Sequence, residues 1–174
     1  MIDQVLRFIV PCAYSVLPKE MHSPKATAEL LAICLQESKA LHRRQVLNNG
    51  SPGPAAGLWQ FERGGGIKGV MTHPKTNGPL ATALTELRYA SAIGDAVKLH
   101  AIVEHNDVVA CVFARLLLWT VPGALARRDE PGKGWSQYIE GWRPGKPHRE
   151  TWTNYYVEAW QRVDQLDTNG ASHT

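Results

Sequence analysis

Apolar residues recur with the 3.6-residue period of an amphipathic α-helix along most of the chain. Ser23 followed by Pro24 is a typical helix start, and the apolar spacing continues from there to about Leu41. Further helical stripes are expected within residues 1–22, 80–94, 95–103 and 152–166. The pattern therefore predicts a mainly α-helical protein.

The segment from Val108 to Thr120 differs from these stripes because it is apolar on nearly every side. A helix that is apolar all round belongs in the middle of a core. We expect Asp107 to be its N-cap and Pro122-Gly123 to end it. This predicts one buried central helix surrounded by amphipathic ones.

Residues 43–79 have little helical periodicity and are rich in turn residues, in the stretches 48–54, 64–66 and 77–79. We expect an irregular segment here that contains a small β-hairpin. Long irregular segments in compact domains are often functional. The connection from Pro122 to the last helix is also rich in Gly, Pro and Lys and is expected to be irregular.

The chain has 174 residues and no repeat or linker, which suits one domain with a full core. We expect residues 1–174 to form that single domain, with residues 169–174 as a frayed tail. Hydrophobic residues at 44% and charged residues at 20% exclude a disordered chain. No apolar stretch approaches the ~18–20 residues of a transmembrane helix, so no membrane span is predicted.

The cysteines and the first residues both indicate synthesis in a reducing cytosol. Residues 1–4 carry no cation, and no small-x-small cleavage site follows Leu17, so a signal peptide is not expected. Cys12, Cys34 and Cys111 are odd in number and far apart, which excludes a disulfide scaffold or a zinc ribbon.

The net charge is +3, and its excess is concentrated in one part of the chain. Residues 37–88 carry seven Lys or Arg against three Glu. This excess fits either a solvated basic face or a groove for an anionic polymer, and both nucleic acid and peptidoglycan qualify.

Two acids are candidates for chemistry. Glu37 lies at the end of the apolar helix, with Leu30 and Ile33 above it on the same face. A carboxyl on an apolar face is desolvated, which raises its pKa and suits a general acid for a glycosidic oxygen. An exposed Glu at a helix end is the alternative. Glu62 follows 25 residues later, a spacing compatible with the two-carboxylate plan of inverting glycosidases or with a surface ion pair.

The stretch 55–62 suits a polymer of sugars. Its small residues allow a close approach of the backbone, Trp59 and Phe61 offer flat faces, and Gln60 offers a donor and an acceptor. A short core strand is the alternative, with Gln60 and Glu62 sharing one face by period two.

Glu37-Ser38, followed twenty residues on by Gly57-Leu58-Trp59-Gln60, resembles the soluble lytic transglycosylases and goose-type lysozymes. In that family the glutamate of the E-S motif is the sole catalytic acid and base, and a G-L-M-Q motif lines the sugar cleft. The resemblance implies a lysozyme-like fold, with Glu37 as the catalytic residue. It also implies that Ser38, Gly57, Trp59 and Gln60 bind substrate.

A later family element, E-T followed by Tyr-Val, is similar to Glu150-Thr151 with Tyr155 and Tyr156, which implies that these tyrosines also contact substrate. The family's A-Y-N-A-G motif has no counterpart: the equivalent stretch, 113–118, contains no Asn. Segments 57–70 and 142–147 are similar to small bacteriophage proteins.

These observations predict a bacteriophage muramidase that cuts the MurNAc-β-1,4-GlcNAc bond, by hydrolysis or by transglycosylation. Its partner is the peptidoglycan glycan strand, together with other virion or tail proteins. It would be made in the host cytoplasm and act on the cell wall, with no cofactor, metal, nucleic acid or membrane span.

Two other functions stay open. The missing Asn favours a non-catalytic virion or tail protein that keeps the fold, and the local basic excess favours a helical nucleic-acid-binding protein. A metal site is not expected, because residues 100–105 fit neither H-E-x-x-H nor H-x-x-E-H.

Overall fold

A computed structural model describes residues 1–171, with side chains described as far as residue 166. The protein is mainly helical, with one small antiparallel sheet, as the sequence predicts. The helical segments are α1 (Ile2–Gln4), η1 (Val5–Ile9), α2 (Val10–Ser15), η2 (Lys19–Met21), α3 (Pro24–Ser38), η3 (Arg63–Ile67), α4 (Lys68–Thr72), α5 (Asn77–Glu86), η4 (Ala90–Ala92), α6 (Ala96–His105), α7 (Asp107–Thr120), α8 (Pro131–Trp142) and α9 (Arg149–Ala171). The strands are β1 (Arg44–Val46), β2 (Pro52–Ala56) and β3 (Phe61–Glu62).

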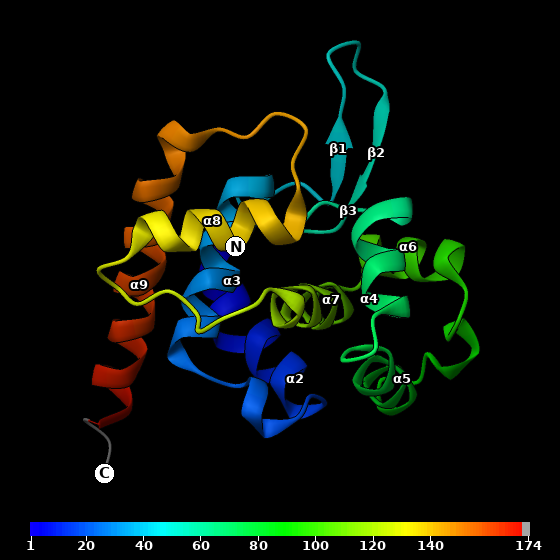
Figure 1. Cartoon of the computed structure of the whole chain (residues 1–174), viewed down its shortest axis with the longest axis horizontal. Helices are drawn as coiled ribbons and strands as arrows, with labels where there is room; N and C mark the ends of the chain where they lie inside the picture. The colour runs from blue at the N-terminus through cyan, green and yellow to red at the C-terminus, as the bar shows by residue number, and fades with distance from the viewer. Residues whose placement is uncertain (172–174) are drawn as a thin grey trace.

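Helix α7 lies in the middle of the molecule, as predicted (Figure 1). Every residue from Val109 to Leu118 is buried, and α2, α3, α4, α5, α6 and α8 all contact this helix. The predicted N-cap is wrong by one residue. Asn106 has the extended backbone of a cap, and its Oδ1 accepts from the amides of Val108 and Val109 at 3.0 and 3.1 Å. Asp107 is the first helical residue.

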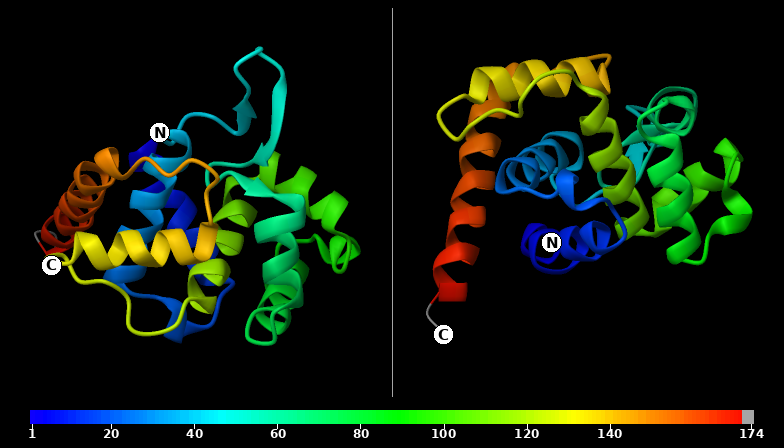
Figure 2. Two further views of the ribbon diagram at one scale, coloured as in Figure 1. Left: turned by 45° about the horizontal axis from the view of Figure 1, so that its top comes forward. Right: turned by 60° about the horizontal axis from the view of Figure 1, so that its bottom comes forward.

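Helix α3 begins as predicted, because the Ser23 hydroxyl accepts from the amide of Ala26 at 3.1 Å and Pro24 takes the first helical position. It ends at Ser38, before the predicted Leu41, because the next two residues adopt left-handed backbone conformations. Helix α9 packs along α3, and Figure 2 shows it as the outer wall beside that helix.

Both terminal segments of the described chain are helical. Residues 2–15 are helical, and Pro11 lacks the N–H that would bond to the carbonyl of Arg7, so a wider π-turn at Val5–Ile9 lies just before it. Helix α9 includes residues 169–171 of the segment expected to be frayed, and residues 172–174 lie outside the described part of the chain.

The predicted hairpin in residues 43–79 is confirmed as an antiparallel sheet of order β1-β2-β3, with Arg44 opposite Ala56 and Ala56 opposite Phe61. Residues 77–79 were expected to form a turn but form the first turn of α5. Pro79 is tolerated there because amides in a first helical turn have no intrahelical partner.

The connection after α7 was expected to be irregular but contains a helix. Helix α8 starts with Pro131 at its first position and buries one face against α9 and α7. Its glycines lower helix propensity, but one of them is required by packing. A Cβ on Gly134 would lie 2.6 Å from the ring of Tyr156 on α9. Tertiary packing therefore stabilises α8 where local propensity does not.

Candidate active site

One large cleft, of about 1520 Å³, brings together segments that are far apart in the sequence. The β1–β2 hairpin, the glycine-rich η3–α4 segment, the end of α7, α8 and the connection from α8 to α9 line it, and α3 contributes Gln36 and Glu37. Figure 1 shows the hairpin and this connection, in orange, rising on the same side of α7. Glu37, Glu62 and Gln60 all line this cleft, so the structure brings together three of the residues singled out in the sequence.

Glu37 is half-buried in the last turn of α3. The hydroxyl of Tyr138 donates to its Oε1 at 2.6 Å. Burial raises the pKa of Glu37 to about 7, while the bond from Tyr138 lowers the pKa and the nearby charge of Glu62 raises it. The expectation of a desolvated carboxyl at this position is confirmed. Near neutral pH it can both donate and accept a proton.

Tyr138 comes from α8 and was not identified in the sequence. Its ring stacks on Trp152 with centroids 5.2 Å apart, and Trp135 and Trp142 lie at 5.4 and 6.3 Å. Burial, followed by the negative charge of Glu37, raises the pKa of Tyr138 well above its ordinary value. The ring is therefore held rigidly, and its hydroxyl stays a donor toward Glu37.

Glu62 is exposed in β3 and reaches the same cleft. Gln60 lies next to it, but the expectation of a shared strand face is wrong. Residues 57–60 form a turn, and Gln60 has a left-handed backbone with φ of 50°. Its amide nitrogen donates to the carbonyls of Gly57 and His42 at 2.8 and 3.2 Å. No described residue donates to its Oε1, which leaves this oxygen to accept from a ligand.

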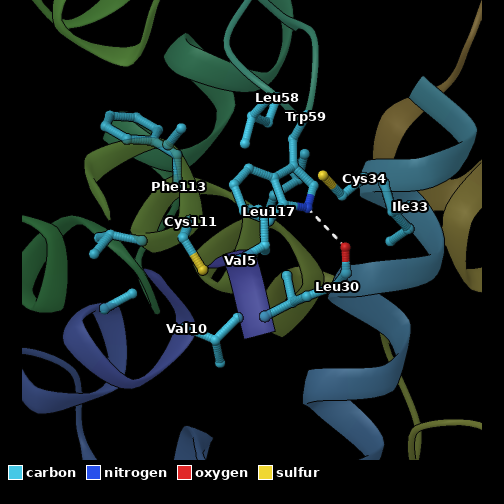
Figure 3. Close-up of a cluster of buried hydrophobic side chains, with 14 of the residues drawn as sticks. Val5, Val10, Leu30, Ile33, Cys34, Leu58, Trp59, Cys111, Phe113 and Leu117 are labelled. Atoms are coloured by element: carbon cyan, nitrogen blue, oxygen red, sulfur yellow. Dashed lines mark hydrogen bonds between the residues drawn. The ribbon is translucent and has the colours of Figure 1, made fainter. Parts of the chain in front are cut away.

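The prediction that Trp59 stacks on sugar is wrong. Its side chain is 0% exposed, and its Nε1 donates to the carbonyl of Leu30 at 2.8 Å. Figure 3 shows the ring enclosed by core residues of α3 and α7, among them Cys34 and Phe113. The turn directs the side chain inward, and the carbonyl of Trp59 accepts at 3.0 Å from Nε1 of Trp142, which lines the cleft.

Ser38 and Gly57 hold the site together and do not line the cleft. The Ser38 hydroxyl is buried and donates to the carbonyl of Leu58 at 2.7 Å, which ties the end of α3 to the turn. Gly57 has φ of +76°, and a Cβ there would lie 2.8 Å from Val103 on α6. The E-S and G-L-W-Q stretches therefore meet. The prediction that Ser38 and Gly57 bind substrate is wrong, because both hold the elements that carry Glu37 and Gln60.

The predicted tyrosines of the last helix also lie away from the cleft. Tyr156 is fully buried, and its hydroxyl donates to the carbonyl of Arg127 at 2.9 Å. Tyr155 is half-buried against the core. The tyrosine beside Glu37 comes from α8 instead, and the signal for it was the spacing of Trp135, Tyr138 and Trp142 at one face of a helix.

Two further sequence features have structural explanations. In the stretch that lacks the family's Asn, Arg115 is buried, and its Nε donates to the carbonyl of Met21 at 2.6 Å, away from the cleft. His100 Nε2 lies 3.0 Å from the carbonyls of both Pro54 and Phe61, where it joins α6 to the sheet. Within the described residues, no group of three or more His, Cys, Asp and Glu is placed to hold a metal ion.

The site thus combines a half-buried carboxyl that titrates near neutrality, an exposed second carboxylate and a free amide oxygen in one long cleft. No protein-family model, curated protein or solved structure matches the chain. None of the helices in residues 1–171 is long and apolar enough to cross a membrane. The geometry of the cleft is therefore the basis for assigning a function.

Proposed function

We propose that the protein is a lysozyme-like muramidase that cleaves the β-1,4 bond between N-acetylmuramic acid and N-acetylglucosamine in peptidoglycan. The observation that carries this proposal is the environment of Glu37. It lines a cleft of about 1520 Å³, and its pKa is raised to about 7. The hydroxyl of Tyr138 on α8 orients it through a hydrogen bond. Acid catalysis of glycoside cleavage needs a carboxyl that is protonated near the working pH and reaches the leaving oxygen.

In the first step, Glu37 donates its proton to the glycosidic oxygen as the bond to the anomeric carbon breaks. The leaving sugar departs as a neutral alcohol, and Glu37 becomes a carboxylate. The hydroxyl of Tyr138 then bonds to a charged oxygen rather than a neutral one, which makes this bond stronger. Tyr138 therefore stabilises the form of Glu37 that the first step generates.

In the second step, the Glu37 carboxylate takes a proton from the nucleophile that attacks the anomeric carbon. If that nucleophile is the 6-hydroxyl of the same muramyl residue, an anhydro sugar forms. If it is water, the product is a reducing sugar, and Glu62 is the second carboxylate available to orient that water. Because Glu62 is exposed and Glu37 alone can serve both steps, attack by the 6-hydroxyl fits the site better than attack by water.

The similarity of segments 57–70 and 142–147 to small bacteriophage proteins suggests where the protein works. We propose a bacteriophage origin, synthesis in the host cytoplasm and action on the cell wall, either from the virion or after lysis begins. Peptidoglycan glycan strands are the proposed binding partner, and other virion or tail proteins are proposed as further partners.

A second candidate function is a non-catalytic virion or tail protein that keeps the same fold. The observation that favours it is the sequence of α7, which contains no Asn that could orient substrate. Arg115 of this helix donates instead to the carbonyl of Met21. This alternative predicts that the cleft binds glycan without turnover.

The test is incubation of the purified protein with isolated sacculi, followed by mass spectrometry of the released muropeptides. Muramidase activity predicts soluble disaccharide-peptides ending in anhydro-muramic acid or in a reducing sugar. Binding to sacculi with no released fragment would favour the non-catalytic candidate instead.

A further inference from the structure

Exposed cations from two separate elements line the cleft. Lys68 lies on α4, and Arg143 and Lys146 lie on the connection from α8 to α9. None of these three side chains forms an ion pair with a described residue. These cations are therefore available to a ligand.

Arg143 is held at the end of α8, where it lines the cleft. It caps the end of α8 with φ of 49° and ψ of 51°, a left-handed conformation that favours glycine. Its Nε donates to the carbonyl of Glu140 at 3.3 Å, which ties the guanidinium group to the end of α8.

The remaining charges on the walls do not cancel these cations. Glu62 and Glu140 are the exposed carboxylates that line the cleft, and His73 and His148 are its imidazoles. Glu37 carries little net charge below its pKa of about 7. With three cations and two exposed carboxylates lining the cleft, the walls favour an anionic ligand.

A sugar backbone is neutral and gains little from these cations, but the peptides attached to muramic acid carry free carboxylates. We propose that Lys68, Arg143 and Lys146 recognise the carboxylates of the stem peptides, so that peptide-substituted glycan is the preferred substrate and unsubstituted glycan is a poor one. This inference rests on the proposed function and adds the part of the substrate that the cleft selects.

The test compares cleavage of intact sacculi with cleavage of the same glycan strands after an amidase has removed their peptides. The double variant Lys68→Gln/Lys146→Gln is matched by the control Lys75→Gln/Lys133→Gln, whose residues are exposed and lie outside the cleft. Exposed ion pairs contribute about 0.2–1 kcal/mol each, so removing two should lower the preference for sacculi about two- to thirtyfold. We expect the control to keep the wild-type preference.

A wild-type protein that cleaves both substrates with equal kcat/KM would overturn this inference and leave the proposed function intact. A protein that cleaves neither, and whose Glu37→Gln variant does not sediment with sacculi, would overturn both. Salt-sensitive binding of a single-stranded oligonucleotide, tighter than binding to sacculi and lost in the cleft double variant, would assign the cations to nucleic acid and overturn the inference. Loss of preference in the control variant as well would do the same, because the effect would then reflect net charge alone.

Discussion

The hydroxyl of Tyr138 lies 2.6 Å from Oε1 of Glu37, which it meets from a helix 101 residues later in the sequence. This bond is one of two opposing influences on the pKa of the carboxyl. Burial favours the protonated form of Glu37, and the Tyr138 hydroxyl favours the ionised form. Their balance holds the pKa of Glu37 at about 7, so a single residue can serve first as acid and then as base.

Removing this donor should raise the pKa of Glu37. In Tyr138→Phe the carboxylate loses a hydrogen bond worth about 1.5–3 kcal/mol to a charged group, which corresponds to a rise of roughly 1–2 pKa units. The alkaline limb of the pH–activity profile should therefore move to higher pH, and kcat should fall because the carboxyl is less well oriented. A Tyr155→Phe control should leave the profile in place, since Tyr155 does not line the cleft. A Tyr138→Phe profile with an unmoved or lowered alkaline limb would contradict this account.

Neutralising Glu62 should have the opposite effect on the same limb. The negative charge of Glu62 raises the pKa of Glu37, so Glu62→Gln should lower that pKa and move the alkaline limb to lower pH by a fraction of a unit. We expect most of the cleavage activity to remain and the products to stay anhydro-muropeptides. Loss of cleavage as complete as in Glu37→Gln, with reducing ends on the wild-type products, would instead identify Glu62 as a catalytic base.

The buried carboxyl of Glu29 should make stability depend on pH. Neither of its oxygens has a hydrogen-bond partner among the described residues, and burial raises its pKa to about 8. Because the folded-state pKa lies above the ordinary value of 4.5, the protonated form stabilises the fold below pH 4.5, and this stability is lost as pH rises through about 8.

Glu29→Gln should remove most of this dependence. In urea unfolding, the wild type should lose about 2–4 kcal/mol between pH 5 and pH 9 through Glu29, and the variant should be the more stable protein at pH 9. An exposed control, Glu20→Gln, should keep the wild-type dependence. Equal pH dependence in the wild type and Glu29→Gln would show that Glu29 does not hold a proton in the folded state.

Two glycines of α8 should respond differently to the same substitution. A Cβ on Gly134 would meet Tyr156 at 2.6 Å and Glu29 at 3.0 Å, so Gly134→Ala should destabilise the fold by about 1–3 kcal/mol. A Cβ on Gly132 meets nothing within 4 Å, and Gly132→Ala should stabilise the helix by up to about 1 kcal/mol. Thermal melting of the two variants measures both effects. Equal melting temperatures would contradict the close packing of α8 against α9.

The sequence was sufficient for the features that depend on one element. Apolar periodicity identified the buried helix α7, and Ser23-Pro24 identified the start of α3. The apolar face of α3 was enough to predict that Glu37 is desolvated. In each case the physical cause lies within a few turns of one helix, where the pattern can be read directly.

Features that depend on contacts between elements were missed. Trp59 has the alternation of a strand in sequence, but a turn at residues 57–60 sends its ring into the core, and no local pattern shows this direction. Helix α8 has glycines that weaken its propensity, and its aromatic face gains meaning only against α9. Tyr138 was therefore missed together with its helix, although it is the tyrosine that lies beside Glu37.

The central claim is that Glu37 is the catalytic acid, and the clearance of a peptidoglycan suspension by purified Glu37→Gln tests it most directly. Glutamine cannot donate a proton but keeps the size of the side chain, so the variant should melt like the wild type. Loss of a general acid typically costs about 10²–10⁴ in rate, so clearance should fall at least 100-fold, while an exposed control, Glu86→Gln, should clear at the wild-type rate. A folded Glu37→Gln protein that clears within about threefold of wild type would contradict the account, since a general acid contributes far more than that.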